Sequence, residues 1–202
     1  MKILAIGRNY AAHIKELNSA NLGEPVIFTM PDTALIQRNK PFFYPKYSSD
    51  IHYEVEVLLK ICKVGKNIEQ KFALDYYEEI GLGIDLTARD LQKKAKDNGL
   101  PWTIAKGFDG SAPISEFVDK KDFDLKNLDF SLHKNGESVQ QGNTSMMLFD
   151  FDYIISYLSQ FFTLKKGDII FTGTPEGVGP VAIGDRLEGY IQDKNFLKVD
   201  VK

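Results

Sequence analysis

Short stretches in which hydrophobic and polar residues alternate recur along the chain, and this pattern predicts a strand-rich fold. Apolar or alternating runs predict strands at residues 2–6, 54–62, 81–86 and 169–172. Residues 130–140 alternate around Asn135-Gly136, a pair typical of a tight hairpin turn. Residues 186–201 predict a second hairpin that turns at residues 193–195.

Helical periodicity is confined to a few short segments between these strands. It predicts helices at residues 9–17, 69–80, 87–97 and 149–162. We expect Thr87 to cap the third helix, with Asp90 completing a weak capping box. Four prolines between residues 23 and 47 favour short extended pieces. The pattern therefore predicts a mixed α/β, strand-rich fold, and 202 residues fit one domain over the whole chain.

Two carboxylates two residues apart, Glu54 and Glu56, lie within one of the apolar strands. Side chains at this spacing share a face of a strand, while Tyr53 and Val55 project to the opposite face, which we expect to be core. Two like charges in a half-buried setting repel each other, and a divalent cation with oxygen ligands relieves that repulsion. The alternative is an edge strand whose glutamates face water.

Two further acidic positions suit a catalytic or metal site. Asp85 ends an apolar strand, where a buried carboxylate is costly unless it is paired or metal-bound. A structural cap or a salt bridge is the alternative. His13 and Glu16 lie three apart on a predicted helix, so the carboxylate can orient the imidazole, although a surface ion pair gives the same spacing. His52 shares the face of Glu54 and either touches the site or serves packing.

The glycine-rich stretches match no nucleotide-binding motif. Gly81-x-Gly83 lacks the third glycine of a dinucleotide fingerprint, and residues 173–180 lack the lysine of a phosphate loop. Glycine in the second stretch allows backbone amides and the Thr174 hydroxyl to approach a ligand, and a simple tight turn is the alternative.

Composition narrows the class of partner. The chain is 43% hydrophobic and 26% charged with a net charge of −3, which gives no basic excess for nucleic acid or anionic membranes. The single cysteine, Cys62, excludes an intramolecular disulfide and Cys-rich zinc sites. The N-terminal apolar run is too short for a signal peptide, and no stretch approaches a membrane span. We expect a cytoplasmic protein whose partners are small molecules or a second copy.

The motifs also occur together in a recognisable order. They are Gly7-Arg8-Asn9-Tyr10-Ala11-x-His13-x-x-Glu16, Glu24-Pro25-Val26, His52-x-Glu54-x-Glu56, Asp85-Leu86-Thr87-Ala88-Arg89-Asp90-x-Gln92, Gly99-x-Pro101-Trp102-x-x-Ala105-Lys106 and Gly173-Thr174-Pro175-x-Gly177-Val178-Gly179-Pro180. Over essentially the whole chain, this order resembles the fumarylacetoacetate hydrolase family. The likeness is strongest to its acylpyruvate hydrolase and oxaloacetate decarboxylase branch.

The resemblance implies a β-roll with short helices, a homodimer and a divalent-metal site. It implies that Glu54, Glu56 and Asp85 bind Mg²⁺ or Mn²⁺, and all-oxygen ligation also suits Ca²⁺. It implies that His13 and Glu16 form the catalytic pair, on a helix that closes over substrate. Groups similar to those that bind substrate or stabilise charge are Arg8, Arg89, Gln92, Lys106 and Thr174. One departure is Met30-Pro31, where relatives usually have Lys-Pro, so a basic group is missing.

The chemistry expected from the resemblance is hydrolysis of a C–C bond in a 2,4-diketo acid of the acylpyruvate type. In that reaction His13 removes a proton from the attacking water, and Lys106 stabilises the oxyanion. Oxaloacetate decarboxylation and keto–enol tautomerisation are alternatives on the same scaffold, and a non-catalytic acid-binding protein is less favoured. The polar segment from Asn9 to Ala20 is predicted to be a mobile lid.

Overall fold

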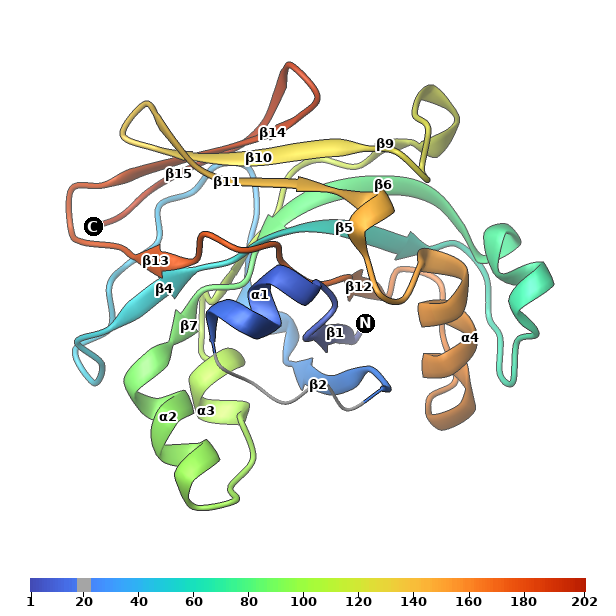
Figure 1. The fold of residues 1–202 in the computed structure, drawn as a ribbon, viewed down its shortest axis with the longest axis horizontal. Coiled ribbons are helices and arrows are strands. Elements are labelled where there is room, and N and C mark those ends of the chain that lie inside the picture. The colour runs from blue at the N-terminus through green and yellow to red at the C-terminus, as the bar shows by residue number, and fades with distance from the viewer. Residues whose placement is uncertain (18–22) are drawn as a thin grey trace.

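A six-stranded sheet runs through the centre of the protein, in a computed structural model that describes residues 1–17 and 23–202 (Figure 1). Its strands, in spatial order, are β2 (Val26–Met30), β1 (Ile3–Gly7), β12 (Ile169–Phe171), β5 (Val55–Ile61), β6 (Tyr77–Ile84) and β9 (Val118–Asp119). β1 and β12 are parallel, and the other neighbours are antiparallel. Because β5 lies between β12 and β6, it is not an edge strand.

A second, antiparallel sheet packs over β5 and β6 (Figure 1). Its strands, in spatial order, are β11 (Glu137–Asn143), β10 (Asp129–Lys134), β14 (Arg186–Ile191) and β15 (Lys194–Asp200). Gly189 allows the two sheets to approach, since a Cβ there would lie 2.6 Å from a methyl carbon of Leu82. Buried Leu82, Leu132 and Leu197 belong to the core cluster between the sheets.

Two small sheets and four short α-helices complete the fold of the described residues. The sheets pair β13 (Gly179–Pro180), β4 (Ile51–Tyr53) and β7 (Thr87–Ala88), and β3 (Leu35–Ile36) with β8 (Ala112–Pro113). The helices are α1 (Ala11–Glu16), α2 (Arg89–Asp97), α3 (Thr103–Lys106) and α4 (Phe151–Phe161). The predicted class, mixed α/β and rich in strands, is confirmed.

Several predicted elements need correction. The helix expected at residues 69–80 is a 3₁₀ helix at Gln70–Tyr76 followed by β6, because pairing with β5 and β9 outweighs the local helical pattern. Thr87 does not cap α2. It pairs with His52 in a strand, and Ala88 is the N-cap without a side-chain bond. Asp90 instead accepts hydrogen bonds from Ser48 and Ser49.

The two hairpins differ in how well the pattern located their turns. Asn135 and Gly136 both have positive φ and form the turn between β10 and β11, as predicted. The second hairpin turns at Gln192 and Asp193, ahead of the predicted position, and Gln192 takes the positive φ. Only the first turn carries the Asn-Gly signal that marks such geometry in a sequence.

Asn9 joins three parts of the fold directly beneath α1. Its side-chain amide donates to the carbonyl oxygens of Thr172, at 2.7 Å, and Phe149, at 3.0 Å. Its side-chain oxygen accepts from the Phe149 backbone N–H at 2.8 Å. Asn9 is fully buried, so these three bonds fix the chain that leads from β1 into α1.

We predict that Asn9→Ala lowers the free energy of unfolding by about 2–4 kcal/mol, because it leaves the buried Thr172 carbonyl and the partly buried backbone groups of Phe149 without this partner. Urea unfolding followed by circular dichroism measures the effect. Asn195→Ala, at an exposed position in β15, is the matched control and should change stability by less than about 0.5 kcal/mol. Equal effects of the two substitutions would contradict the role given to Asn9.

Candidate metal centre and active site

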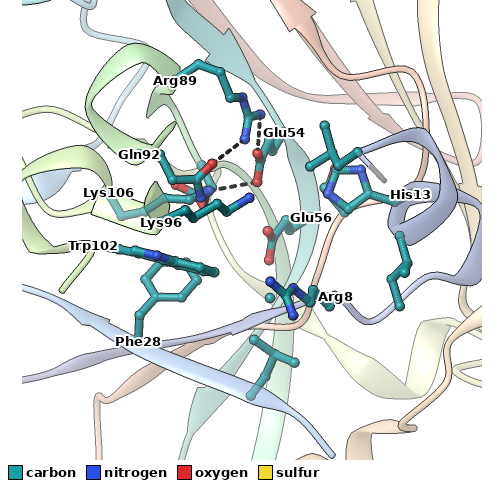
Figure 2. Close-up of a pocket in the computed structure, with 16 residues that line it drawn as sticks. Arg8, His13, Phe28, Glu54, Glu56, Arg89, Gln92, Lys96, Trp102 and Lys106 are labelled. Atoms are coloured by element: carbon teal, nitrogen blue, oxygen red, sulfur yellow. Dashed lines mark hydrogen bonds and ion pairs between the residues drawn. The ribbon is translucent and has the colours of Figure 1, made fainter. Parts of the chain in front are cut away.

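A pocket opens where α1, α2 and α3 meet the ends of the central strands (Figure 2). The residues that line it include nine of the ten predicted site residues: Arg8, His13, Glu54, Glu56, Asp85, Arg89, Gln92, Lys106 and Thr174. Glu16 does not line the pocket but contacts His13. Segments far apart in sequence thus bring the predicted groups into one cavity.

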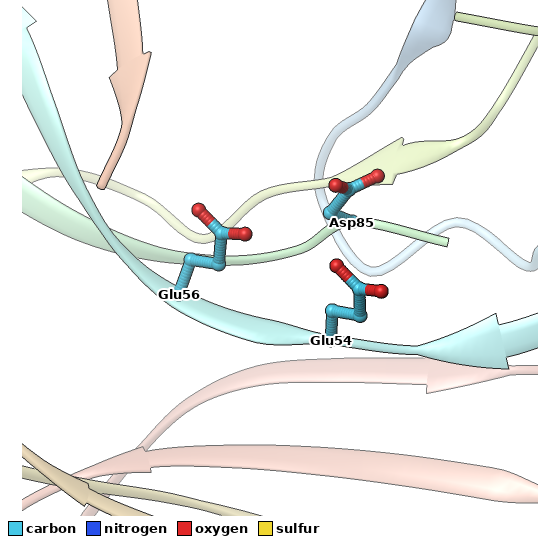
Figure 3. Close-up of side chains that lie close together, drawn as sticks. All are labelled: Glu54, Glu56 and Asp85. Carbon is cyan, nitrogen blue, oxygen red and sulfur yellow. The ribbon is translucent and has the colours of Figure 1, made fainter. Parts of the chain in front are cut away.

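Glu54, Glu56 and Asp85 converge at the floor of this pocket (Figure 3). One carboxylate oxygen from each lies within 4.8 Å of the others, and all three residues are buried. The register of β5 with β6 explains this arrangement. Val55 pairs with Ile84, and the Asp85 backbone N–H donates to the Glu54 carbonyl at 2.8 Å, so Asp85 follows β6 beside the glutamates.

Two cationic side chains offset the negative charge of Glu54. Lys106 Nζ donates to Glu54 Oε2 at 2.8 Å, to Asp85 Oδ2 at 2.5 Å and to Thr87 Oγ1 at 2.6 Å. Arg89 Nη2 donates to Glu54 Oε1 at 2.6 Å. Burial by itself raises the pKa of Glu54, but Lys106 and Arg89 together bring that pKa below its usual value. Glu54 therefore stays ionised inside the protein.

For Glu56 and Asp85 the cost of burial is only partly offset by their partners. Burial, followed by repulsion from Asp85 and Glu54, raises the pKa of Glu56 well above its usual value, although Glu56 Oε2 accepts from the Gly173 N–H at 2.7 Å. Burial also raises the pKa of Asp85 to about 7 against the attraction of Lys106. Asp85 Oδ1 is buried without a hydrogen-bond partner among the described residues.

These observations fit a divalent cation. Buried oxygen ligands from three carboxylates, one of them with an unpartnered oxygen, form a donor set that suits Mg²⁺, Mn²⁺ or Ca²⁺. Thiol and imidazole ligands, which zinc prefers, are not part of the cluster. Repulsion among the carboxylates, which raises the pKa of Glu56, is the force that such an ion would relieve.

His13 is held by a chain of two hydrogen bonds. Its Nδ1 lies 3.1 Å from Glu16 Oε2, and Glu16 Oε1 accepts from the Gly177 N–H at 2.9 Å. His13 is 6% exposed and projects from α1 into the pocket (Figure 2). In this conformation α1 is docked, with His13 inside the pocket. Residues 18–20 of the predicted lid lie outside the described residues, and lid motion stays a prediction.

Lys96, Trp102 and Phe28 also line the pocket, and sequence reasoning gave none of them a role in the site. Arg89, Gln92 and Lys96 follow at the i, i+3 and i+7 spacing that defines one face of α2, and this signal was available in the sequence. The Lys96 ammonium lies 5.5 Å from the centre of the Trp102 ring. Trp102 in turn contacts Phe28, with ring centres 5.9 Å apart.

Other groups considered in the sequence lie elsewhere. His52 Nε2 bonds with Asp50 Oδ1 at 2.8 Å, and His52 does not line the pocket. Met30 is buried in a small core cluster that includes Ile3 and Phe171. Lys96 is a further cation that lines this pocket.

Comparison with known proteins identifies the family. Residues 2–202 match the family model described as fumarylacetoacetate (FAA) hydrolase C-terminal, so the chain belongs to this family. It is 44% identical over 201 residues to oxaloacetate tautomerase FAHD1, mitochondrial, of Mus musculus, with 99% of this chain and 91% of that protein covered. It is 46% identical over 189 residues to oxaloacetate decarboxylase, mitochondrial, of Dictyostelium discoideum, with 93% and 87% covered.

A solved structure agrees in both fold and sequence. The crystal structure of fumarylpyruvate hydrolase from Pseudomonas aeruginosa, in complex with Mn²⁺ and pyruvate, superposes with a TM-score of 0.94 at 35% identity. All of this chain and 89% of that chain are covered. The predicted family and fold are therefore confirmed, whereas the Mus musculus and Dictyostelium discoideum relatives carry names other than hydrolase.

Within residues 1–17 and 23–202, none of the helices has the length and apolar character needed to cross a membrane. The expected cytoplasmic location stays a prediction.

We predict that Glu56→Gln stabilises the metal-free protein by about 1–2 kcal/mol at pH 7, because it removes a crowded charge. The pKa of Glu56 is raised on folding, so metal-free wild-type protein should lose stability as pH rises above the ordinary glutamate pKa. The variant should show a smaller loss. Thermal unfolding in EDTA at several pH values measures both effects.

With Mn²⁺ added, the same experiment should show the wild type to be more stable than Glu56→Gln. Bound metal stabilises the wild type by mass action, about 2.7 kcal/mol at 100-fold excess over Kd, whereas Glu56→Gln loses a ligand. Glu137→Gln, at an exposed site in β11, is the control and should behave as wild type. A Glu56→Gln variant that Mn²⁺ stabilises as much as it does the wild type would remove Glu56 from the metal site.

Proposed function

We propose that this protein is a divalent-metal-dependent enzyme that interconverts the keto and enol forms of oxaloacetate or a closely similar 2-keto dicarboxylate. The observation that carries the proposal is His13, fixed by Glu16 and directed into the pocket that contains the carboxylate cluster. The mouse and Dictyostelium relatives, both named for oxaloacetate, support this substrate over an acylpyruvate. C–C bond hydrolysis becomes the second candidate, supported by the fumarylpyruvate hydrolase structure. Decarboxylation of oxaloacetate is the third.

The residues of the pocket divide into two groups in this proposal. Glu54, Glu56 and Asp85 would hold Mg²⁺ or Mn²⁺, which supplies Lewis-acid stabilisation of negative charge on the 2-oxo oxygen when bound. Arg8, Arg89 and the Thr174 hydroxyl line the same cavity and bind the anionic oxygens of the substrate. Gln92 positions Arg89, since its Oε1 accepts from Arg89 Nη1 at 2.7 Å.

His13 transfers the proton. Glu16 occupies Nδ1, so Nε2 is the nitrogen left for the substrate. It takes a proton from the carbon between the 2-oxo group and the second carboxylate of the keto form, which leaves an enolate, and the enol forms when the 2-oxo oxygen takes a proton from solvent. In the reverse direction the enol oxygen gives up its proton and His13 returns a proton to the carbon. Lys106, whose pKa is raised by Asp85 and Glu54 in spite of burial, stays protonated and contributes positive charge beside the cluster. Mere binding of an acid would not need such a base.

Lys96 is the residue that would bind the second carboxylate of a dicarboxylate substrate. Its side chain lines the pocket (Figure 2), and none of the carboxylates in the described chain forms an ion pair with it. Burial and the nearby charges of Arg89 and Arg8 lower the pKa of Lys96. A substrate carboxylate beside Lys96 would offset the repulsion among these three positive charges. A homodimer, as the resemblance implies, is kept as part of the proposal.

We predict that His13→Ala lowers the enzyme-catalysed rate of oxaloacetate tautomerisation about 10²–10⁴-fold, because it removes the general base. Glu16→Gln should lower it in the same direction by disturbing the imidazole. The decay of enol absorbance above the uncatalysed rate, at saturating Mg²⁺, measures the effect. Lys15→Ala, exposed on the same helix, is the control.

The same preparations separate the three candidate reactions. Pyruvate release from oxaloacetate reports decarboxylation, and loss of an acylpyruvate reports hydrolysis. Wild-type protein that cleaves an acylpyruvate but leaves the tautomerisation rate of oxaloacetate at the uncatalysed value would reject our proposal in favour of hydrolysis. A His13→Ala variant with full tautomerase activity would exclude His13 as the base.

We predict that Lys96→Met lowers kcat/KM about 10-fold for oxaloacetate and much less for an acylpyruvate that lacks a second carboxylate. Methionine keeps the packing of the stem against Trp102 and removes the charge. Lys94→Met, exposed on α2, is the matched control. An equal loss on both substrates would show that Lys96 does not read the second carboxylate.

A further inference from the structure

Gln140 connects the second sheet to the active site, although it does not line the pocket. It lies in β11 and is buried. Its side-chain oxygen accepts from the Val55 N–H at 2.9 Å, between the two metal-site glutamates of the chain. Its side-chain nitrogen donates to Thr174 Oγ1 at 2.9 Å and to the Pro175 carbonyl at 3.1 Å. Thr174, in contrast, lines the pocket.

The three contacts fix the orientation of the Gln140 amide. Exchanging its oxygen and nitrogen would place the NH₂ group against the Val55 N–H, donor against donor. It would also place the oxygen against the Pro175 carbonyl, acceptor against acceptor. Both contacts are buried, where unpaired polar groups are costly. The NH₂ group must therefore face Thr174.

This orientation determines what the Thr174 hydroxyl can do. A hydroxyl carries one hydrogen, and its oxygen already accepts from Gln140. Among the described residues, none accepts a hydrogen bond from the Thr174 hydroxyl, and Thr174 is 3% exposed. The hydroxyl hydrogen is thus left for a group inside the pocket. A threonine without this partner would be able to rotate and present either its hydrogen or its lone pairs.

We propose that Gln140 is a positioning residue that makes Thr174 a committed hydrogen-bond donor to an anionic oxygen of the substrate. The inference rests on the proposed function, because it needs an anionic substrate in this pocket. It gives the second sheet a part in substrate recognition, through a side chain that does not touch the substrate.

Binding of oxalate to the Mn²⁺-loaded protein tests the proposal, measured by isothermal titration calorimetry. We expect Thr174→Val to raise the Kd of oxalate about 10-fold, because a hydrogen bond to a charged group is lost. Gln140→Met should raise it several-fold by releasing the hydroxyl. In the double variant the effect of Gln140→Met should disappear. Gln141→Met, exposed at the next position of β11, is the control and should leave the Kd unchanged.

A merely structural role of Gln140 predicts a different result. It would lower the thermal midpoint and the affinity for Mn²⁺, and the loss of oxalate binding would persist in the Thr174→Val background. Thr174→Ser keeps the hydroxyl and should restore oxalate binding relative to Thr174→Val only when Gln140 is present. Additive effects of the two substitutions would overturn the proposal.

A second variant covers the case in which Gln140→Met does not fold. Gln140→Glu keeps the shape and the acceptor for the Val55 N–H, and its other oxygen accepts from Thr174, which reverses the bond. If part of the effect of Gln140→Glu on the Kd of oxalate vanishes in the Thr174→Val background, that part acts through the Thr174 hydroxyl. If none of the effect vanishes there, the proposal is overturned. Wild-type protein that does not bind oxalate with Mn²⁺ would reject the proposed function itself. Normal binding by wild type and both Gln140 variants would reject only the role of Gln140.

Discussion

Burial of three carboxylates at one point is the constraint on which the rest of this structure depends. Glu54, Glu56 and Asp85 face one another in a cavity shielded from water, where like charges are most costly. Lys106 and Arg89 compensate one of them, and the Gly173 N–H approaches another. The remaining charge is what a divalent ion would balance. A fold that keeps this cluster in place is therefore selected for ligand binding and not for stability alone.

The sheet makes this arrangement possible because β5 is central. Its odd-numbered residues, such as Val55 and Val57, are held in the core, so the even-numbered glutamates must face the cavity. Pairing with β6 adds Asp85 from the neighbouring strand end. Gly173 completes the surroundings of the carboxylates. Its φ is +104°, and a Cβ there would lie 2.6 Å from Cβ of Asn9, so only glycine can bring its N–H to Glu56 in this position.

The sequence shows these features unequally, for physical reasons. The shared face of Glu54 and Glu56 follows from the two-residue period of a strand, and Asp85 is marked by its place after an apolar run. The contact of Lys106 with Glu54 joins residues 52 positions apart, and periodicity carries no information about it. Gln140 in a hairpin looks like any polar strand residue until the packing of the two sheets buries it. Residues 77–80 are predicted as helix because the local sequence carries no sign of β5 and β9, the strands that pair with them on either side.

The site also explains why one scaffold can serve several reactions. Tautomerisation, decarboxylation and C–C hydrolysis of 2-keto acids all place negative charge on the same oxygen, so the same cationic surroundings assist each of them. What differs is the atom from which His13 takes its proton, either carbon or water, and decarboxylation requires no such base. In the function we propose, Lys96 and the Thr174 hydroxyl fix how the substrate lies and thereby which atom His13 meets. The position of the substrate then decides which of these reactions occurs. A few hydrogen-bond donors around the shared cationic surroundings hold that position, and a small change in the pocket lining can shift the substrate.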